Sequence, residues 1–289
     1  MSSTEVVIAS AARTPIGSFQ GALGSLAAPD LGAVAIKEAV KRANLQPADI
    51  ERVIMGCVLS GGIGQAPARQ ASIKAGLPVE TGAITINKVC GSGLQAVMFA
   101  RREILVGDAE ILVAGGMESM TNAPYLLPNA RAGYRMGNGQ LIDSMIYDGL
   151  WDPYDNVHMG TCGDAVAKKY EFTREQQDAF ARASFERAIQ AQKAGKFKTE
   201  IVGVPVPQKK GDPLIVDEDE GPKKAQLDKM PGLRPAFTKD GTVTAANASS
   251  INDGAAALVV TSAATAAKRG LPVLARILGD SCAAVEPKW

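Results

Sequence analysis

The sequence predicts an α/β protein with a parallel or mostly parallel sheet that is covered by helices on both faces. Short apolar runs alternate with helical patterns over the first 117 residues, and the links between them are short. The strand runs are apolar at successive positions, which is typical of strands buried on both faces. A length of 289 residues and a hydrophobic content of 46% allow a sizeable core in one large or two ordinary domains.

The expected elements follow from the spacing of apolar residues. Runs rich in β-branched residues predict strands at 6–9, 53–59, 84–87, 111–114, 242–245, 255–260 and from 273 onwards. A spacing of three to four residues predicts helices at 30–43, 66–75, 92–106, 173–195 and 261–269. Thr173 and Gln176 form a capping box, and Gly107 and Gly270 stand where C-terminal caps are expected.

The chemically most informative stretch joins the predicted strand at 84–87 to the predicted helix at 92–106. Cys90 lies between them, so it is expected on a strand-to-helix turn at a helix N-terminus. The free N–H groups and the helix dipole favour an anion there, which favours the nucleophilic thiolate. Gly91 and Gly93 lack a Cβ and are expected to let a substrate approach the sulfur. The alternative is that Cys90 is a small buried core residue.

Composition narrows the function classes. A net charge of +1 gives no reason to expect nucleic acid or an acidic membrane surface as a partner. The four cysteines contain no C-x-x-C pair, which argues against a zinc site and a disulfide framework. The sequence shows no signal peptide and no apolar run of transmembrane length, so a cytoplasmic location is expected. His158 is the single histidine.

Several longer motifs then occur in a fixed order, and together they resemble those of the thiolase family. Within that family, the resemblance is to the biosynthetic acetyl-CoA acetyltransferases (acetoacetyl-CoA thiolases). The matching motifs are Arg13-Thr14-Pro15-Ile16-Gly17, Asn87-x-x-Cys90-Gly91-Ser92-Gly93, Gly115-Gly116-Met117-Glu118-Ser119-Met120, His158-Met159-Gly160, Leu233-Arg234-Pro235-Ala236-Phe237 and Asn247-Ala248-Ser249-x-x-Asn252-Asp253-Gly254.

The resemblance implies a five-layered αβαβα fold of two similar halves, with a loop domain inserted into the first half. It divides the chain into an N-terminal core half (1–117 and 242–270), an inserted coenzyme A-binding loop domain (118–241) and the start of the second half (271–289). Only the first half, its loop domain and the opening strand of the second half are expected in this sequence.

The resemblance also implies a reaction and its residues. Two acetyl-CoA molecules would form acetoacetyl-CoA and CoA reversibly through an acyl group on Cys90. Substrate and CoA contacts would come from Leu150, His158, Met159, Phe237, Ala248 and Ser249. No cofactor is expected besides the CoA thioester substrates, and the full-length protein is expected to be a homodimer or homotetramer. From the residues alone, His158 is read as an ordinary loop histidine, and Ser249 as a cap for the turn before Ile251.

Three further thiolase motifs do not occur in these residues: Asn-Glu-Ala-Phe, a Gly-His-Pro segment and a late Cys-x-Gly. They supply the histidine that activates the nucleophile and the cysteine that acts as acid and base. We therefore expect this chain alone to be catalytically impaired. Two alternatives stay open: a condensing enzyme of the ketoacyl synthase type, and a non-catalytic fragment that binds CoA or dimerises.

Overall fold

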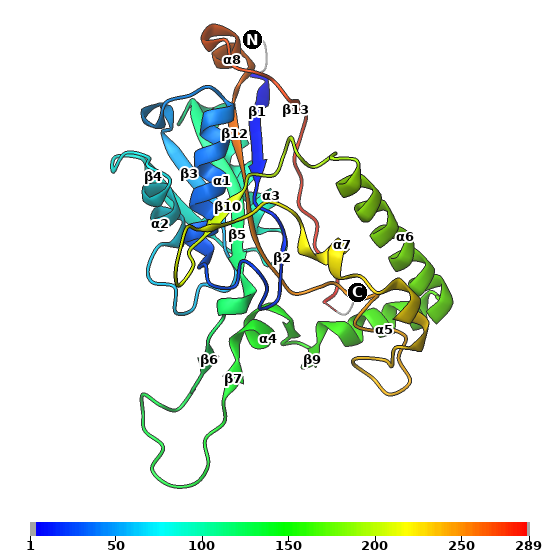
Figure 1. Ribbon diagram of the computed structural model, residues 1–289. Helices are drawn as coiled ribbons and strands as arrows, with labels where there is room; N and C mark the ends of the chain where they lie inside the picture. The colour runs from blue at the N-terminus through cyan, green and yellow to red at the C-terminus, as the bar shows by residue number, and fades with distance from the viewer. Residues whose placement is uncertain (1–3, 288–289) are drawn as a thin grey trace.

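A seven-stranded mixed sheet forms the centre of the computed structural model, which describes residues 4–287 (Figure 1). Residues 1–3 and 288–289, at the ends of the first and last predicted divisions, lie outside the described residues. In order across the sheet, the strands are β13 (Ala275–Ile277), β1 (Val6–Arg13), β12 (Asn252–Ser262), β5 (Ile111–Ser119), β3 (Arg52–Gly56) and β4 (Gly82–Ile86), and β2 (Gly17–Ser18) pairs with β12.

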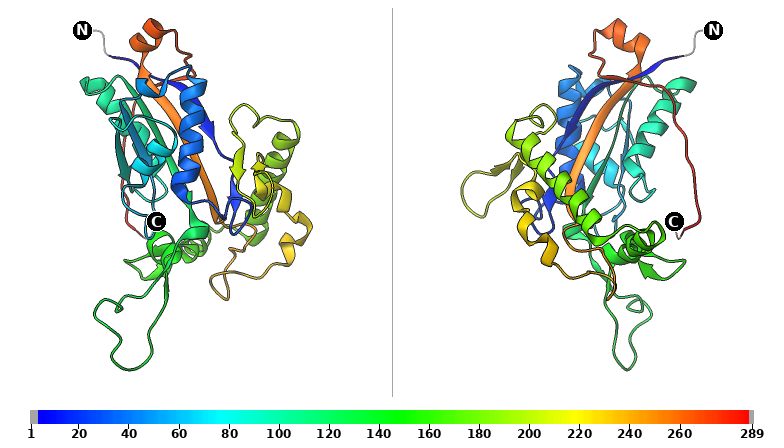
Figure 2. Two further views of the ribbon diagram at one scale, coloured as in Figure 1. Left: turned by 60° about the vertical axis from the view of Figure 1, so that its left-hand side comes forward. Right: turned by 90° about the vertical axis from the view of Figure 1, so that its right-hand side faces the viewer.

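Helices cover both faces of this sheet, as the sequence predicts (Figure 2). On one face, α1 (Ala28–Arg42) and α2 (Pro67–Lys74) pack over a core that contains Leu31, Ile36 and Met55. On the other face, α3 (Ser92–Val106) packs over a smaller core that contains Ile54 and Leu112. The layered α/β expectation is therefore confirmed for the three layers that the described residues form.

The strand directions differ from the predicted parallel or mostly parallel arrangement. β3 pairs in parallel with β4 and β5, but β12 runs antiparallel to both β1 and β5 at the centre of the sheet. β13 is also antiparallel to β1. An apolar run predicts a buried strand without predicting its direction, and β12 returns to the sheet from a long irregular segment instead of a crossover helix. The sheet is therefore mixed.

The segment between β5 and β12 contains mostly short elements. A hairpin formed by β6 and β7 projects away from the sheet at the bottom of Figure 1, and the long helix α6 lies on the right of that view, away from the sheet (Figures 1 and 2). The elements are η2 (Met120–Asn122), β6 (Tyr125–Leu126), β7 (Ile142–Asp143), α4 (Ser144–Gly149), β8 (Trp151–Asp152), β9 (Val157–His158), α5 (Met159–Lys169), α6 (Arg174–Lys193), β10 (Val204–Val206), β11 (Leu214–Val216), α7 (Glu220–Lys224) and η3 (Leu227–Gly232). Outside this segment lie η1 (Pro47–Asp49) and α8 (Ala263–Arg269).

Part of this segment packs directly on the core half. The β10–β11 pair contributes Val204, Val206 and Val216 to the larger core cluster. The guanidinium of Arg13 donates to Glu200 at 2.8 Å and to both carboxylate oxygens of Asp219 at 2.7 and 3.0 Å. Bidentate pairs of this kind fix geometry as well as charge. The arginine of the first motif therefore ties the 200–220 segment to the end of β1.

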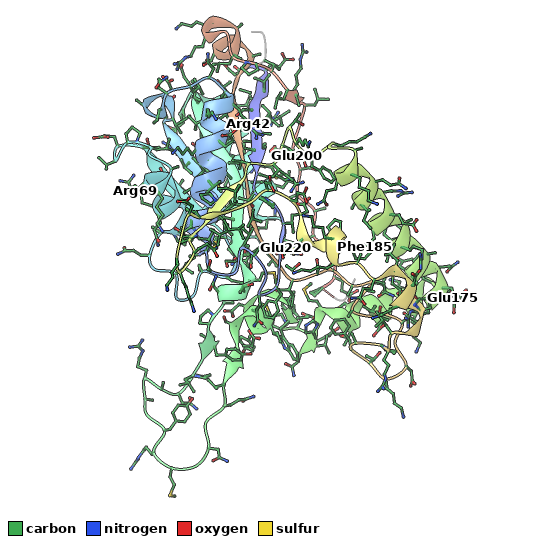
Figure 3. All side chains as sticks on the ribbon, viewed as in Figure 1. Arg42, Arg69, Glu175, Phe185, Glu200 and Glu220 are labelled. Carbon is green, nitrogen blue, oxygen red and sulfur yellow. The ribbon has the colours of Figure 1, made fainter. Side chains whose placement is uncertain are left out.

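A second arginine strengthens the same connection from α1. Arg42 donates to three successive main-chain carbonyl oxygens, those of Thr199, Glu200 and Ile201 (Figure 3). Glu220 lies further along the segment, and its carboxylate accepts from the main-chain N–H groups of Ser18 and Ala22. These contacts join the segment to the sheet. The division of the chain into domains at 117/118 and 241/242 therefore stays a prediction.

Two predicted strands differ from the structure. The strand expected at 242–245 is irregular, because the main-chain N–H groups of Thr242 and Val243 donate to Asp164 of α5 instead of to a neighbouring strand. The strand expected at 53–59 ends at Gly56, where the chain leaves the sheet. The predicted capping box of Thr173 and Gln176 is confirmed at the start of α6. Within the described residues, no helix has the length and apolar character needed to cross a membrane.

Candidate active site

Cys90 lies in the turn between β4 and α3 and is exposed. The residue before it, Val89, has a φ of +47°, which a β-branched residue rarely adopts and which costs on the order of 1–3 kcal/mol. Hydrogen bonds hold this strained turn. The Val89 N–H donates to the side chain of Asn87 at 2.9 Å, and the Ser92 hydroxyl donates to the Val89 carbonyl at 2.6 Å. Asn87 and Ser92 therefore position the cysteine between them.

The start of α3 rests directly on the sheet because small residues meet there. A Cβ on Gly56 would lie 2.5 Å from the Cβ of Ser92, and a Cβ on Gly116 would lie 3.4 Å from the Cα of Gly93. The missing Cβ of Gly93 points at the main chain of Gly115 and Gly116. The sequence predicts that Gly93 gives a substrate access to the sulfur. In the structure, the nearest neighbours of its missing Cβ are main-chain atoms of the sheet. Among residues 4–287, no side chain caps the N-terminus of α3, where Gly91 is the N-cap residue.

A cavity of about 400 Å³ opens beside Cys90. Its walls come from the ends of β3 and β5, the start of α3, the first half of β12 and the end of α4. The lining residues are mostly small or apolar: Gly56, Cys57, Val58, Leu59, Val89, Cys90, Ser92, Gly93, Gly116, Met117, Glu118, Met120, Gly149, Leu150, Gly254, Ala255 and Ala256. The structure thus brings two of the predicted site residues, Cys90 and Leu150, to one cavity.

A second hollow of about 1010 Å³ adjoins the first, and both are lined by Val58, Val89 and Gly149. Met159 and Asn87 line this second hollow, together with aromatic residues of the 147–154 segment. Met159 itself is half-exposed. A slender ligand that occupied the larger hollow could therefore reach the cavity of Cys90 past Val58 and Val89.

His158 and Phe237 form a stacked pair, with ring centroids 4.7 Å apart and an interplanar angle of 25°. The Nδ1 atom of His158 accepts a hydrogen bond from the Gly160 N–H at 3.0 Å, so the imidazole also caps α5. Burial lowers the pKa of His158, which favours the neutral form that can accept this bond. The structure brings these two predicted residues together, but neither belongs to the described lining of the Cys90 cavity.

Ala248 and Ser249 belong to an irregular loop and are also absent from that lining. Asn247 holds the loop in place, since its amide donates to Asp178 of α6 at 2.9 Å and its carbonyl oxygen accepts from the Thr244 N–H at 2.7 Å. The Ser249 side chain is exposed and makes no hydrogen bond to the described residues, so it does not cap the following turn. Its hydroxyl is free to contact a ligand.

Two groups in the Cys90 cavity were not identified from the sequence as site residues. Cys57 lines the cavity with its buried thiol 3.7 Å from Glu118. Burial, followed by the negative charge of Glu118, raises the pKa of Cys57 to about 12. Burial also raises the pKa of Glu118. The sequence does indicate Glu118, because this acidic residue follows the apolar run at 111–114. Its hydrogen-bond partners, Val58 and Leu59, lie about 60 residues away in the chain.

Comparison with known protein families identifies the class to which this fold and this turn belong. The family model described as "Thiolase, N-terminal domain" matches residues 6–264, which is most of the chain. The chain therefore belongs to the thiolase family, as its motifs predict.

Curated relatives are similar over nearly the whole chain. The acetyl-CoA acetyltransferase of Cupriavidus necator is 58% identical over 286 residues, which are 99% of this chain and 73% of the relative. The acetyl-CoA acetyltransferase of Pseudomonas aeruginosa is 53% identical and is covered to 72%. Acetyl-CoA acetyltransferase 2 of Arabidopsis thaliana is 52% identical and is covered to 71%. The resemblance to acetyl-CoA acetyltransferases is therefore confirmed at the level of sequence similarity.

Proposed function

We propose that this protein is an acyltransferase that moves acetyl groups between CoA thioesters through Cys90. The overall reaction converts two acetyl-CoA molecules reversibly into acetoacetyl-CoA and CoA. The observation that carries the proposal is an exposed thiol on a strained turn at the uncapped N-terminus of α3, beside an apolar cavity of about 400 Å³. The names and identities of the curated relatives support the choice of substrates.

The acylation step follows from thioester chemistry. The Cys90 thiolate attacks the carbonyl carbon of acetyl-CoA, the carbon–sulfur bond to CoA breaks, and CoA leaves as a thiolate. A new thioester on Cys90 then holds the acetyl group. One carbon–sulfur bond has formed and one has broken. The methyl carbon of a second acetyl-CoA, after it has lost a proton, or the thiolate of a free CoA then attacks this thioester; the bond to the Cys90 sulfur breaks, and Cys90 leaves as a thiolate. No cofactor other than these CoA compounds enters this reaction.

The pantetheine arm of CoA is assigned in this proposal to the larger hollow and its surroundings. Met159 lines that hollow, and the preceding residue, His158, stacks on Phe237. Leu150 lies at the cavity of Cys90, where the acyl group would sit. A thin amide chain suits a mostly apolar passage with a few polar groups, for which Ala248 and the free hydroxyl of Ser249 are further candidates.

Trapping of the acyl intermediate tests this proposal. When the purified chain is incubated with acetyl-CoA, quenched in acid and digested, the acetyl group is expected on Cys90. The Cys90→Ser variant is expected to lose the label, because a serine hydroxyl at a helix N-terminus does not ionise at neutral pH. Cys282→Ser is the matched control, since Cys282 is also an exposed thiol and lies outside the cavity lining. Acetylation of Cys282 in place of Cys90 would refute the assignment.

We also propose a cytoplasmic homo-oligomer that assembles through the β4 edge and α3. β4 is an edge strand of the sheet, and an edge presents unpaired main-chain groups to a second strand. Large apolar side chains are exposed beside it, including Ile84 on β4 and Leu94 on α3, which is 70% exposed. In light scattering the mass is expected to exceed that of one chain. An Ile84→Lys change on the strand is expected to shift it toward the monomer, and a monomeric parent at high concentration would contradict the proposal.

A further inference from the structure

Glu118 makes an unusual set of contacts at the base of the Cys90 cavity. It lies near the end of β5, and its two carboxylate oxygens accept from two successive main-chain N–H groups, those of Val58 at 2.8 Å and Leu59 at 3.1 Å. The Cys57 thiol adds a third, longer contact at 3.7 Å. Hydrogen bonds from main-chain N–H groups to a carboxylate are short and strong compared with those to a neutral acceptor.

These contacts replace the sheet at the point where β3 ends. Beyond Gly56 the chain turns away from β5, so the N–H groups of Val58 and Leu59 lose the strand partners that the preceding residues have. Buried main-chain N–H groups require an acceptor, and Glu118 provides one for both. The carboxylate reaches this turn from the neighbouring strand and therefore fixes where residues 57–59 run.

The turn that Glu118 holds is also a wall of the cavity. Val58 and Leu59 both line it, and Leu59 is almost completely buried. A Cβ on Gly149 would lie 3.4 Å from the Leu59 side chain, which places Leu59 against the end of α4, next to Leu150. The position of Leu59 thus decides how much room remains between Cys90 and the segment that follows α4.

We propose that Glu118 is a positioning residue for acyl-chain length: by holding the Val58–Leu59 main chain, it keeps the Leu59 side chain in the cavity and restricts Cys90 to short acyl groups. The inference rests on the proposed function for its substrate class. The physical limit is steric, because an additional methylene in an apolar pocket changes selectivity by roughly ten- to 200-fold. A carboxylate that is costly to bury is retained here because it accepts from both N–H groups.

Two alkylating reagents test the shape of the cavity without requiring acyl transfer. Iodoacetamide and its N-hexyl derivative react with the same thiol and differ only in the length of the apolar chain. The measured quantity is the ratio of their alkylation rates at Cys90, determined by peptide mapping in a Cys282→Ser background. Glu118→Ala is expected to raise the relative rate of the hexyl reagent about tenfold, because the released turn lets Leu59 move aside.

Three further variants separate positioning from general damage. Leu59→Ala is expected to produce the same change in ratio with Glu118 intact. Glu118→Gln keeps one acceptor oxygen but presents an amide N–H₂ to the second donor, so an intermediate ratio is expected. Glu80→Ala removes an exposed carboxylate elsewhere and is expected to leave the ratio unchanged. If Glu118→Ala does not fold, as judged by circular dichroism, the Leu59→Ala and Glu118→Gln ratios decide in the same way.

The outcome that overturns the inference is an unchanged ratio in folded Glu118 and Leu59 variants, or an equal loss of both reagents' rates. The failure of the proposed function would look different. In a parallel series with acetyl-, butyryl- and hexanoyl-CoA, an absence of any label on Cys90 would reject acyl transfer, even where the alkylation ratio changes as expected. A shift toward hexanoyl-CoA in the same variants would support both.

Discussion

Alanine at position 56 is expected to slow the acetylation of Cys90 by about a hundredfold, the loss that a displacement of roughly 1 Å at a reacting group can produce. The new Cβ would lie 2.5 Å from the Ser92 Cβ and 2.8 Å from the Gly93 N atom. β3 cannot retreat, because it is paired on both sides, with β4 and β5. The start of α3 must therefore move away from the sheet, and the Cys90 turn moves with it.

The same change is expected to destabilise the fold by about 1–3 kcal/mol, as is usual when a methyl group is forced into a packed site. The measurements are the acetylation rate by mass spectrometry and the free energy of unfolding in urea. Gly82→Ala is the matched control, because this glycine also lies in a strand and its Cβ would come no closer than 3.8 Å to Arg52. An unchanged acetylation rate in folded Gly56→Ala would show that the contact does not position Cys90.

The 289-residue chain, assayed alone, is expected to cleave acetoacetyl-CoA with CoA about 10²–10⁴-fold more slowly than the relative from Cupriavidus necator. The reason is that the described lining residues include no histidine, and their carboxylate, Glu118, already accepts from the main-chain N–H groups of Val58 and Leu59. His158 is the single histidine, and it stacks on Phe237 outside that lining. The other thiol in the cavity, Cys57, has a pKa of about 12 and stays protonated at neutral pH.

Added imidazole provides the control for this prediction. A small base that diffuses into an open cavity is expected to accelerate the acetylation of Cys90 in this chain, whereas the relative is expected to respond much less. Rates are compared at equal ionic strength and at several imidazole concentrations. Turnover by the chain that matches the relative without imidazole would show that a base within these residues activates Cys90.

The parts of the site that the sequence predicts are those whose determinants lie close together in the chain. The helix at Ser92–Val106 begins and ends where its pattern predicts, and the exposed cysteine precedes it. The exposure also decides against the alternative that Cys90 is a buried core residue. Hydrogen bonds over two or three residues, from Val89 to Asn87 and from Ser92 to Val89, hold the turn. Such short-range contacts depend on local sequence alone.

Contacts between distant segments account for what the sequence does not predict. Glu118 meets Val58 and Leu59 about 60 residues away, and Asp164 removes Thr242 from any strand across 78 residues. Both cases concern main-chain N–H groups whose acceptor is a side chain of another element. A pattern of apolar residues predicts that a segment is extended, but it carries no information about such an acceptor. The strand predicted at 53–59 is therefore too long, and the strand predicted at 242–245 does not form.

The sequence by itself determined the layered α/β class, the cysteine at the junction of strand and helix, and the membership of the thiolase family, because each is written in local spacing or in contiguous motifs. The tertiary structure alone decided that β12 runs antiparallel through the centre of the sheet, that Cys57 and Glu118 share the cavity with Cys90, and that His158 pairs with Phe237 away from that cavity's lining. The physical reason is that the direction of a strand, the burial of a side chain and the distance between two residues depend on which distant surfaces pack together. Packing energy is a property of the assembled core.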